Sequence, residues 1–391
     1  MAQLVDMLGL HGVPGEALSE ATYFACLRVL SEGVGKLPLK VLQKTEEKGV
    51  DERHDLHLYE VLRYRPNPYM TATRFWSSVE TARNHFGNAF VRIEGAGDKL
   101  ELYQMPSDEV TVWWDDAKIL GKDAAVWLVW KTPSGKAYKI PYDSALHFRT
   151  WLSFDGMVGL PVQDILKSTL QGNLTSQNLL NRMYENGFTT KAVLYYTGNL
   201  EDGREKTYIK NVEKYATGKV DGAKSILPIP VGSKLEPLNI KLTDNQFIEI
   251  KKYSALQVAA AFGVKPNQIN DYEKTSYANS ESQQLAFLVD TLLWILKDYE
   301  EEIIFKLLSK EMRSKGNIAK FNTAVMLRAD AKTQLEALAM AVNNNLYTPN
   351  EARALIDYPA KKGGDELLGN GNLIPTALAG MQYRQKGDED T

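Results

Sequence analysis

The pattern of apolar and polar residues changes at about residue 160. Before it, five short runs rich in β-branched and aromatic residues are separated by turn residues at hairpin-like spacing, which predicts an antiparallel sheet. These runs are NAFVRI, LELYQM, EVTVWW, AVWLVW and ALHFR. Two helices are predicted before them, one from Ser19 as N-cap to about Val34 and one from Thr71 or Thr73 to about Phe86. The first part of the chain is therefore predicted to be one α+β domain.

After residue 160 the apolar residues follow helical spacing. The predicted helices are 160–187, Phe247–Phe262, Gln284–Leu308, KTQLEALAMAVNNNL and TPNEARALID. The last of these has a capping-box pattern, with Thr348 at the N-cap, Pro349 at N1 and Glu351 at N3. A compact insert at 188–242 combines the strand KAVLYY, a helix over 200–218 and the short strands KSILPIP and KLEPLNI. FNTAVMLRAD is predicted as one further strand.

One connection in this helical part is unusually long. Gly263–Gln283 is a polar stretch between the helix Phe247–Phe262 and the very apolar helix Gln284–Leu308. Most helix–helix connections take about two to eight residues, and a much longer one is usually functional or disordered. The many aromatic and Asn/Gln residues here favour a function. The following helix is apolar on most sides, so it is expected to be buried on most sides.

Composition and charge narrow the class of protein. A chain of 391 residues predicts two or more domains. The single cysteine, Cys26, excludes an intrachain disulfide, fits a reducing compartment and is predicted to be buried and inert. No signal peptide or membrane span is expected. A net charge of −3 argues against a broad basic face that grips nucleic acid, although nucleic acid could still slide past.

The sequence contains only weak candidates for a catalytic or metal site. GVGK, at Gly33–Lys36, lacks the leading glycine and following Ser/Thr of a phosphate loop. His54 and His57 stand among acids, but a solvated loop is favoured over a metal site because no second ligand cluster is evident. His147 is predicted to be a satisfied core histidine. No nucleophile elbow, zinc-protease or dinucleotide motif occurs, so no enzyme, metal or cofactor is predicted.

Several segments occur along the chain in a characteristic order. They are ACLRVLSEGVGKLPLKVLQ, HDLHLYEVLRYRPNPYMTATRFWSS, FGNAFVRI, ALHFR, VAAAFGVKPNQI, YANSESQQLAFLVDTLLWIL, LRADAKTQLEAL and LYTPNEARALI. In these segments and their order the chain resembles the portal (connector) proteins of tailed bacteriophages, of the type found in many long-tailed phages. The resemblance covers roughly Glu20 to Asp357.

The resemblance implies an α+β portal fold whose regions can be laid onto the chain. The wing would be 1–159 with 300–330, the stem helices 160–187 and 243–262, the clip 188–242, the tunnel loop 263–283, the long helix into the wing 284–308, and the crown with the C-terminal tail 330–391. It also implies a dodecameric ring at one capsid vertex, in the virion, assembled in the bacterial host cytoplasm. Double-stranded DNA would pass through the axial channel during packaging and ejection, and a separate motor would supply the ATPase.

The implied partners define two groups of candidate site residues. The tunnel loop would face non-specifically bound DNA through Lys265, Asn267, Gln268, Asn270, Tyr272, Lys274 and Tyr277. Its net charge of −1 suits a constriction in which DNA must not stall. The clip would meet the large terminase subunit and a head–tail adaptor through Lys206, Lys210, Lys214, Lys219 and Lys224. The major capsid protein or a scaffolding protein would be a further partner, and no membrane is involved.

Two other classes of protein stay open on the sequence. One is a nucleic-acid-processing or tail-associated enzyme with a site around Asp51, His54 and His57. The other is a nonviral ring or scaffold. Particle mass separates the first from a portal, and the passage of duplex DNA through the ring separates the second.

Overall fold

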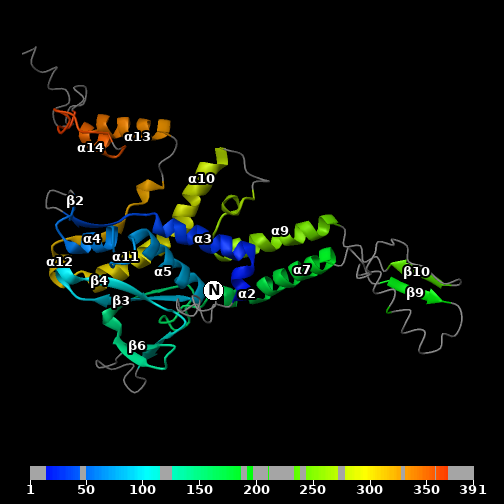
Figure 1. The fold of residues 1–391 in the computed structure, drawn as a ribbon. Helices are drawn as coiled ribbons and strands as arrows, with labels where there is room; N and C mark the ends of the chain where they lie inside the picture. The colour runs from blue at the N-terminus through cyan, green and yellow to red at the C-terminus, as the bar shows by residue number, and fades with distance from the viewer. Residues whose placement is uncertain are drawn as a thin grey trace, which may run out of the picture. The chain divides into compact units, whose positions relative to one another are not determined.

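The computed structural model describes residues 15–44, 50–114, 126–185, 192–196, 210, 233–237, 244–271, 278–326, 331–356 and 358–368. The chain divides into two compact units, Met1–Asn322 and Thr323–Thr391 (Figure 1).

The sheets formed by the described residues of the first unit are antiparallel and small. Their orders are β11-β1-β2, β4-β3-β8, β5-β6-β7 and β10-β9. The strands are β1 (Leu39–Lys44), β2 (Val50–Glu52), β3 (Asn88–Glu94), β4 (Glu101–Met105), β5 (Val110–Trp114), β6 (Val126–Lys131), β7 (Ala137–Pro141), β8 (Ala145–Arg149), β9 (Ala192–Tyr196), β10 (Ser233–Pro237) and β11 (Asn317–Phe321). The first sheet joins residues that are far apart in the sequence, since Leu39 pairs with Phe321.

Helices supply the remaining regular structure of this unit. They are α2 (Gly15–Ser19), α3 (Ala21–Gly35), α4 (His57–Arg63), α5 (Ala72–Phe86), α6 (Val162–Ile165), α7 (Lys167–Glu185), α9 (Asp244–Ala261), α10 (Ala278–Phe287), α11 (Leu293–Leu307) and α12 (Lys310–Ser314). A π-helical turn, Leu288–Leu292, connects α10 to α11, and the short 3-10 turns are Gly97–Lys99, Tyr142–Ser144 and Pro266–Ile269. None of the described helices is long and apolar enough to cross a membrane.

The core is organised around Trp76 of α5, which is fully buried. Its ring meets Phe148 of β8, Tyr299 of α11 and Phe321 of β11 at centroid distances of 6.1, 6.0 and 6.4 Å. Aromatic pairs at such distances add stabilisation beyond the area they bury. One side chain thus brings together elements from three distant parts of the chain.

The helices α7 and α9 lie side by side in Figure 1. Ser254 of α9 hydrogen-bonds to Asn173 of α7 across the pair. The β9-β10 hairpin comes from the insert between these two helices, and its register pairs Leu194 with Leu235. The predicted strand KAVLYY is confirmed, whereas KSILPIP and most of the predicted helix over 200–218 lie outside the described residues.

Several element boundaries differ from the sequence-based predictions. The first long helix is capped by Glu20, whose carboxylate accepts from the Tyr23 N–H, and not by Ser19. The strand β7 was not predicted, because its residues Ala137–Pro141 are mostly exposed and carry little apolar periodicity. The last strand ends at Phe321, where FNTAVMLRAD was predicted to begin a strand; instead a 3-10 turn follows at Thr323–Val325.

The second unit contains α13 (Ala331–Asn343) and α14 (Pro349–Ala354). The capping box of α14 is confirmed: Thr348 Oγ1 accepts from the Glu351 N–H, and the Glu351 carboxylate accepts from the Thr348 N–H. Asn350 also holds the following segment, since its side chain accepts from the Lys361 N–H and donates to Asp365. Both elements were predicted from local signals alone.

Candidate functional site

The polar segment after α9 begins in the core. Phe262 and Val264 are buried, and the Phe262 ring lies 5.2 Å from that of Tyr23. Gly263 between them has a φ of +69°, in the left-handed region that favours glycine. A Cβ at this position would lie 2.9 Å from Thr291 Oγ1. The start of the segment is therefore anchored by packing and by a close backbone approach.

The next residues form a compact turn. Pro266–Ile269 is a 3-10 helix, in which the Lys265 N–H donates to the side-chain oxygen of Gln268 at 3.1 Å. The turn closes where the Asp271 N–H donates to the Pro266 carbonyl at 3.0 Å. Asn270 has a φ of 64°, a conformation that Asn tolerates better than most residues. The segment is thus folded as far as Asp271.

The π-helical turn Leu288–Leu292 holds the folded start of this segment, residues 263–271, in place. Thr291 Oγ1 donates to the Gly263 carbonyl at 2.7 Å, and Lys265 Nζ lies 2.8 Å from Asp290 Oδ2. Such turns occur frequently at functional sites. We call Gly263, Lys265, Asp290 and Thr291 the base clamp. Two neighbouring residues of one irregular turn therefore fix both the backbone and the first cation of the segment.

The predicted boundaries of this segment change accordingly. The long helix begins at Ala278 as α10, so the last part of the predicted 263–283 loop is helical. Of the residues predicted to face DNA, four belong to the folded start of the segment: Lys265, Asn267, Gln268 and Asn270. The other three, Tyr272, Lys274 and Tyr277, lie outside the described residues. Contact of these side chains with DNA stays a prediction.

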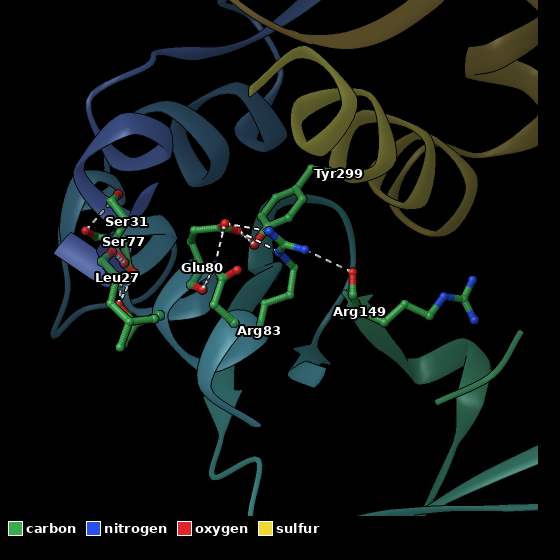
Figure 2. Close-up of polar contacts among 9 residues, drawn as sticks. Leu27, Ser31, Ser77, Glu80, Arg83, Arg149 and Tyr299 are labelled. Atoms are coloured by element: carbon green, nitrogen blue, oxygen red, sulfur yellow. Dashed lines mark hydrogen bonds and ion pairs between the residues drawn. The ribbon is translucent and has the colours of Figure 1, made fainter. Parts of the chain in front are cut away.

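A buried ion pair ties the long helix to the core (Figure 2). Arg83 of α5 donates through Nε and Nη2 to the Glu80 carboxylate at 2.8 and 2.6 Å, and through Nη1 to the Arg149 carbonyl at 3.2 Å. Tyr299 of α11 donates its hydroxyl to Glu80 at 2.9 Å. Asn84 adds a fourth donor, at 2.7 Å. Every oxygen and nitrogen of the pair is thereby satisfied, as burial requires.

Burial and nearby charge both shift the pKa values of the groups in this cluster. Burial lowers the pKa of Arg83, but the attraction of Glu80 and its hydrogen bonds outweigh burial, and the net shift is upward. Burial and then Glu80 raise the pKa of Tyr299 well above its usual range. Arg83 therefore stays charged and Tyr299 stays protonated as a donor. These groups hold structure together and are not poised for proton transfer.

His147 of β8 belongs to a second buried network. The Asn88 side-chain oxygen accepts from the Gly159 N–H, so His147 Nε2, 3.0 Å away, is the protonated nitrogen that donates to it. His147 Nδ1 then accepts from the Tyr142 hydroxyl at 3.1 Å. Burial, with Arg149 and Lys306 nearby, lowers the pKa of His147 to about 3. The prediction of a satisfied core histidine is confirmed.

The alternative site around His54 and His57 does not assemble as a metal centre. His54 pairs with Glu52 at 3.4 Å, while His57 opens α4 and hydrogen-bonds to the Leu100 carbonyl at 3.2 Å. The predicted solvated loop was therefore wrong for His57, which is half-buried. Across the described ranges, no group of three or more His, Cys, Asp or Glu residues could hold a metal ion. Asp51 lies exposed on β2.

Two other sequence-based expectations can be compared with the structure. Cys26 is fully buried, and burial raises the pKa of its thiol to about 12, which confirms that it is an inert core residue. Among the predicted clip lysines, Lys210 is exposed and helical, whereas Lys206, Lys214, Lys219 and Lys224 lie outside the described residues. Their role in docking stays a prediction.

The chain has an α+β fold in which the buried ionisable residues serve packing. Its fold is shared with a structure described as the neck of an empty GTA particle computed with C6 symmetry, with a TM-score of 0.60 and 18% identity over 91% of this chain and 94% of that one. It is also shared with an HK97-family phage portal protein from Corynebacterium diphtheriae, with a TM-score of 0.56 and 16% identity over 81% and 97% of the two chains.

Comparisons of the sequence also find portal proteins of phages. The chain is 25% identical over 395 residues to the portal protein of Enterobacteria phage HK97, covering 97% of this chain and 89% of the relative. It is 24% identical over 383 residues to a probable portal protein of Streptomyces phage phiC31, covering 93% and 79%. The model of the phage portal protein family matches residues 21–357. The chain belongs to the phage portal protein family, and the predicted portal fold is confirmed.

Proposed function

We propose that this protein forms a dodecameric ring at one capsid vertex and that its channel carries double-stranded DNA during packaging and ejection. The observation that carries the proposal is the family match over residues 21–357. It is supported by likeness to neck structures computed with C6 and with C12 symmetry, which have TM-scores of 0.60 and 0.55. The protein would act in the virion after assembly in the bacterial cytoplasm. Its own role would be structural, with no catalysis.

Charge at the base clamp fits such a channel. B-DNA carries about one negative charge per 1.7 Å of its axis, so a strongly cationic constriction would hold it in place. Lys265 is the first cation of the predicted tunnel loop, and Asp290 lies 2.8 Å from it. Its attraction for a phosphate is thereby reduced. We infer that the loop touches DNA through polar groups such as Asn267, Gln268 and Asn270, together with moderate attraction from Lys265 and Lys274.

We propose that the packaging machinery docks on the segment 188–242. That segment carries nine Lys and Arg residues against six Asp and Glu. We propose that Lys206, Lys210, Lys214, Lys219 and Lys224 meet the large terminase subunit and a head–tail adaptor. Reversing Lys210 and Lys214 to Glu should weaken terminase binding and leave rings intact. Unchanged binding and packaging would remove the idea. The major capsid or scaffolding protein would meet another face.

The ring itself is tested by mass and symmetry. Twelve copies of the 43.9 kDa chain weigh about 530 kDa, and class averages of the purified particle should show a ring with an open axis. Cryo-electron microscopy of packaged heads should then show duplex DNA in that axis. A particle that stays a monomer or dimer under assembly conditions would favour the alternative enzyme. A ring whose channel excludes duplex DNA would favour a nonviral scaffold.

A further inference from the structure

The long helix after the predicted tunnel loop leaves one apolar face in solvent. Leu285 of α10, Val289 of the π-helical turn and Leu293 of α11 are 48%, 52% and 42% exposed. On the other face, Leu288 and Leu292 are 4% and 0% exposed and pack into the core. We call Leu285, Val289 and Leu293 the apolar stripe. A row of exposed apolar side chains, unlike a single one, marks an interaction surface.

The π-helical turn brings the three side chains of the stripe into line. In an α-helix, residues four apart differ by about 40° around the axis, so Leu285 and Leu293 would diverge by about 80°. The π turn, Leu288–Leu292, takes one more residue per turn and rotates the following helix back. The irregular turn therefore points the stripe in one direction, toward one partner.

The helix α10 has few contacts within its own unit. Among the described elements it packs mainly on the π turn that continues it, and in Figure 1 it projects beyond α3 and α9. Its last residue, Phe287, is buried near Gly33 of α3, whereas Ser282, Gln284 and Leu285 are exposed. Helices in proteins are stabilised mainly by the packing of an amphipathic face. The stripe is the apolar face that α10 has available for such packing.

Apolar exposure is concentrated at the end of the helix next to the loop. Trp294, which is 50% exposed, adjoins the stripe there. Farther along α11, exposed positions are taken by Lys297 and Glu301, which pair at 3.1 Å. Phe305 is exposed as well, but the guanidinium of Arg313 lies over its ring at 5.3 Å. The helix therefore suits an apolar contact near the loop and solvent farther away.

Ring geometry indicates what covers that end. Around a twelvefold axis, equivalent points of adjacent copies are separated by about half their distance from the axis. Helices pack about 8–10 Å apart, so helices that lie about 15–19 Å from the axis contact their own copies. In the proposed ring the tunnel loop borders the DNA channel, and α10 begins at Ala278, within the predicted loop 263–283. The helix α10 therefore belongs to the part of the chain that the ring brings closest to its neighbours.

We infer that the apolar stripe packs against α10 of the neighbouring copy in the ring. The inference rests on the proposed function and names the surface through which adjacent copies meet beside the channel. The charged side chain of the π turn, Asp290, is paired with Lys265, so no unpaired charge of that turn enters the contact. The start of each tunnel loop is then fixed by the base clamp of its own chain, and its end by the neighbouring chain. Adjacent loops are thereby linked mechanically.

Labelling of an introduced cysteine tests whether a neighbour covers the stripe. The variant Val289→Cys is treated with a maleimide, once in assembled rings and once as unassembled chains at low protein concentration. We expect labelling to be at least tenfold slower in the rings. Lys297→Cys on α11 is the matched control and should react equally in both states. The native Cys26 is fully buried and should not react.

Each other outcome contradicts the inference in its own way. Fast labelling of Val289→Cys in intact rings would show that the stripe stays open to solvent. Slow labelling in unassembled chains as well would show that another segment of the same chain covers it. Equal protection of Lys297→Cys in rings would show that the contact is not confined to the end next to the loop. Wild-type chains that form no ring under the microscope would instead overturn the proposed function, and the inference with it.

A charge placed in the stripe gives an independent measure. Leu285→Asp should raise the protein concentration needed for half-assembly at least tenfold, because a carboxylate would be buried without a partner. The urea midpoint of the unassembled chain should stay unchanged, since Leu285 is exposed there. Val50→Asp on the edge strand β2 is the matched control, because Val50 has a similar exposure of 53%. Assembly unchanged in Leu285→Asp, or shifted equally by the control, would contradict the assignment.

Discussion

Two ion pairs of similar length lie in different surroundings. Arg83 and Glu80 are 2.6 Å apart, with side chains that are 4% and 0% exposed. Lys265 and Asp290 are 2.8 Å apart, with side chains that are 29% and 57% exposed. Breaking a buried pair typically costs about 3–5 kcal/mol because a charge is left without a partner, whereas an exposed pair contributes about 0–1 kcal/mol. Burial, and not distance, separates the pair that maintains the fold from the pair whose loss should cost little stability.

The largest expected effect is at the buried pair. Arg83→Leu should lower the free energy of unfolding by about 3–5 kcal/mol, because Glu80 would stay buried with only neutral donors. Urea unfolding followed by tryptophan fluorescence measures it. The double variant Glu80→Leu/Arg83→Leu should lose less than Arg83→Leu alone, since both charges are gone. A single variant within 1 kcal/mol of wild type would mean that water reaches this pair.

A smaller effect is expected from the second buried network. The folded pKa of His147 is lowered to about 3, and unfolded histidine titrates near 6.5. The unfolded chain therefore binds the proton first as the pH falls, and stability is lost between pH 6.5 and about 3. The loss amounts to about 3 kcal/mol by pH 4.5.

Comparing variants isolates this contribution. His147→Gln removes the titrating group, so its stability should fall less steeply than that of the wild type between pH 6.5 and 5, where most carboxylates stay ionised. Denaturation curves at three pH values in this window suffice. Parallel slopes for the two proteins would show that His147 is already protonated in the folded state.

The smallest change in stability is expected at the base clamp. Lys265→Ala should alter the free energy of unfolding by no more than about 0.5 kcal/mol, and rings should assemble normally. With Lys274→Ala added, we expect shortened or leaking genomes, because the loops would hold DNA less firmly between motor strokes. Genome length in purified heads is the measurement.

Lys297→Ala is the matched control for this experiment. Lys297 forms an exposed pair with Glu301 at 3.1 Å on α11, outside the predicted tunnel loop 263–283. It should leave both stability and genome length unchanged. Full-length genomes in the Lys265→Ala/Lys274→Ala heads, or an equal defect in the control, would separate the loop from DNA handling.

The buried ion pair also shows which structural features could not be predicted from the sequence. Local signals predicted α14, because Thr348 and Glu351 cap it without help from the rest of the chain. In contrast, Glu80 and Arg83 have the spacing of an ordinary surface pair on a helix. Their burial follows from Tyr299, which is more than two hundred residues away. The local signal for the burial of Glu80 and Arg83 was the presence of the apolar residues Trp76 and Val79 on the same helix, both of which are buried.

Other differences have the same origin. The position of β11 was wrong by several residues because its limits are set by pairing with β1, where Val41 faces Ala319. The π-helical turn was not predicted, since one additional residue in a helical turn leaves no mark in hydrophobic spacing. The exposed face of the long helix was also unexpected: Leu285, Val289 and Leu293 are exposed, although the helix was predicted to be buried on most sides.

The pairing of β1 with β11 has a consequence for synthesis of the protein. β1 is the central strand of its sheet, but its partner β11 ends at Phe321. A ribosome must therefore translate most of the message before the first strand can be paired on both sides. Until then the nascent chain carries an open strand edge, a state prone to aggregation. We expect fragments that stop before residue 317 to require chaperones, and a shortened chain made for expression should extend past Asn322.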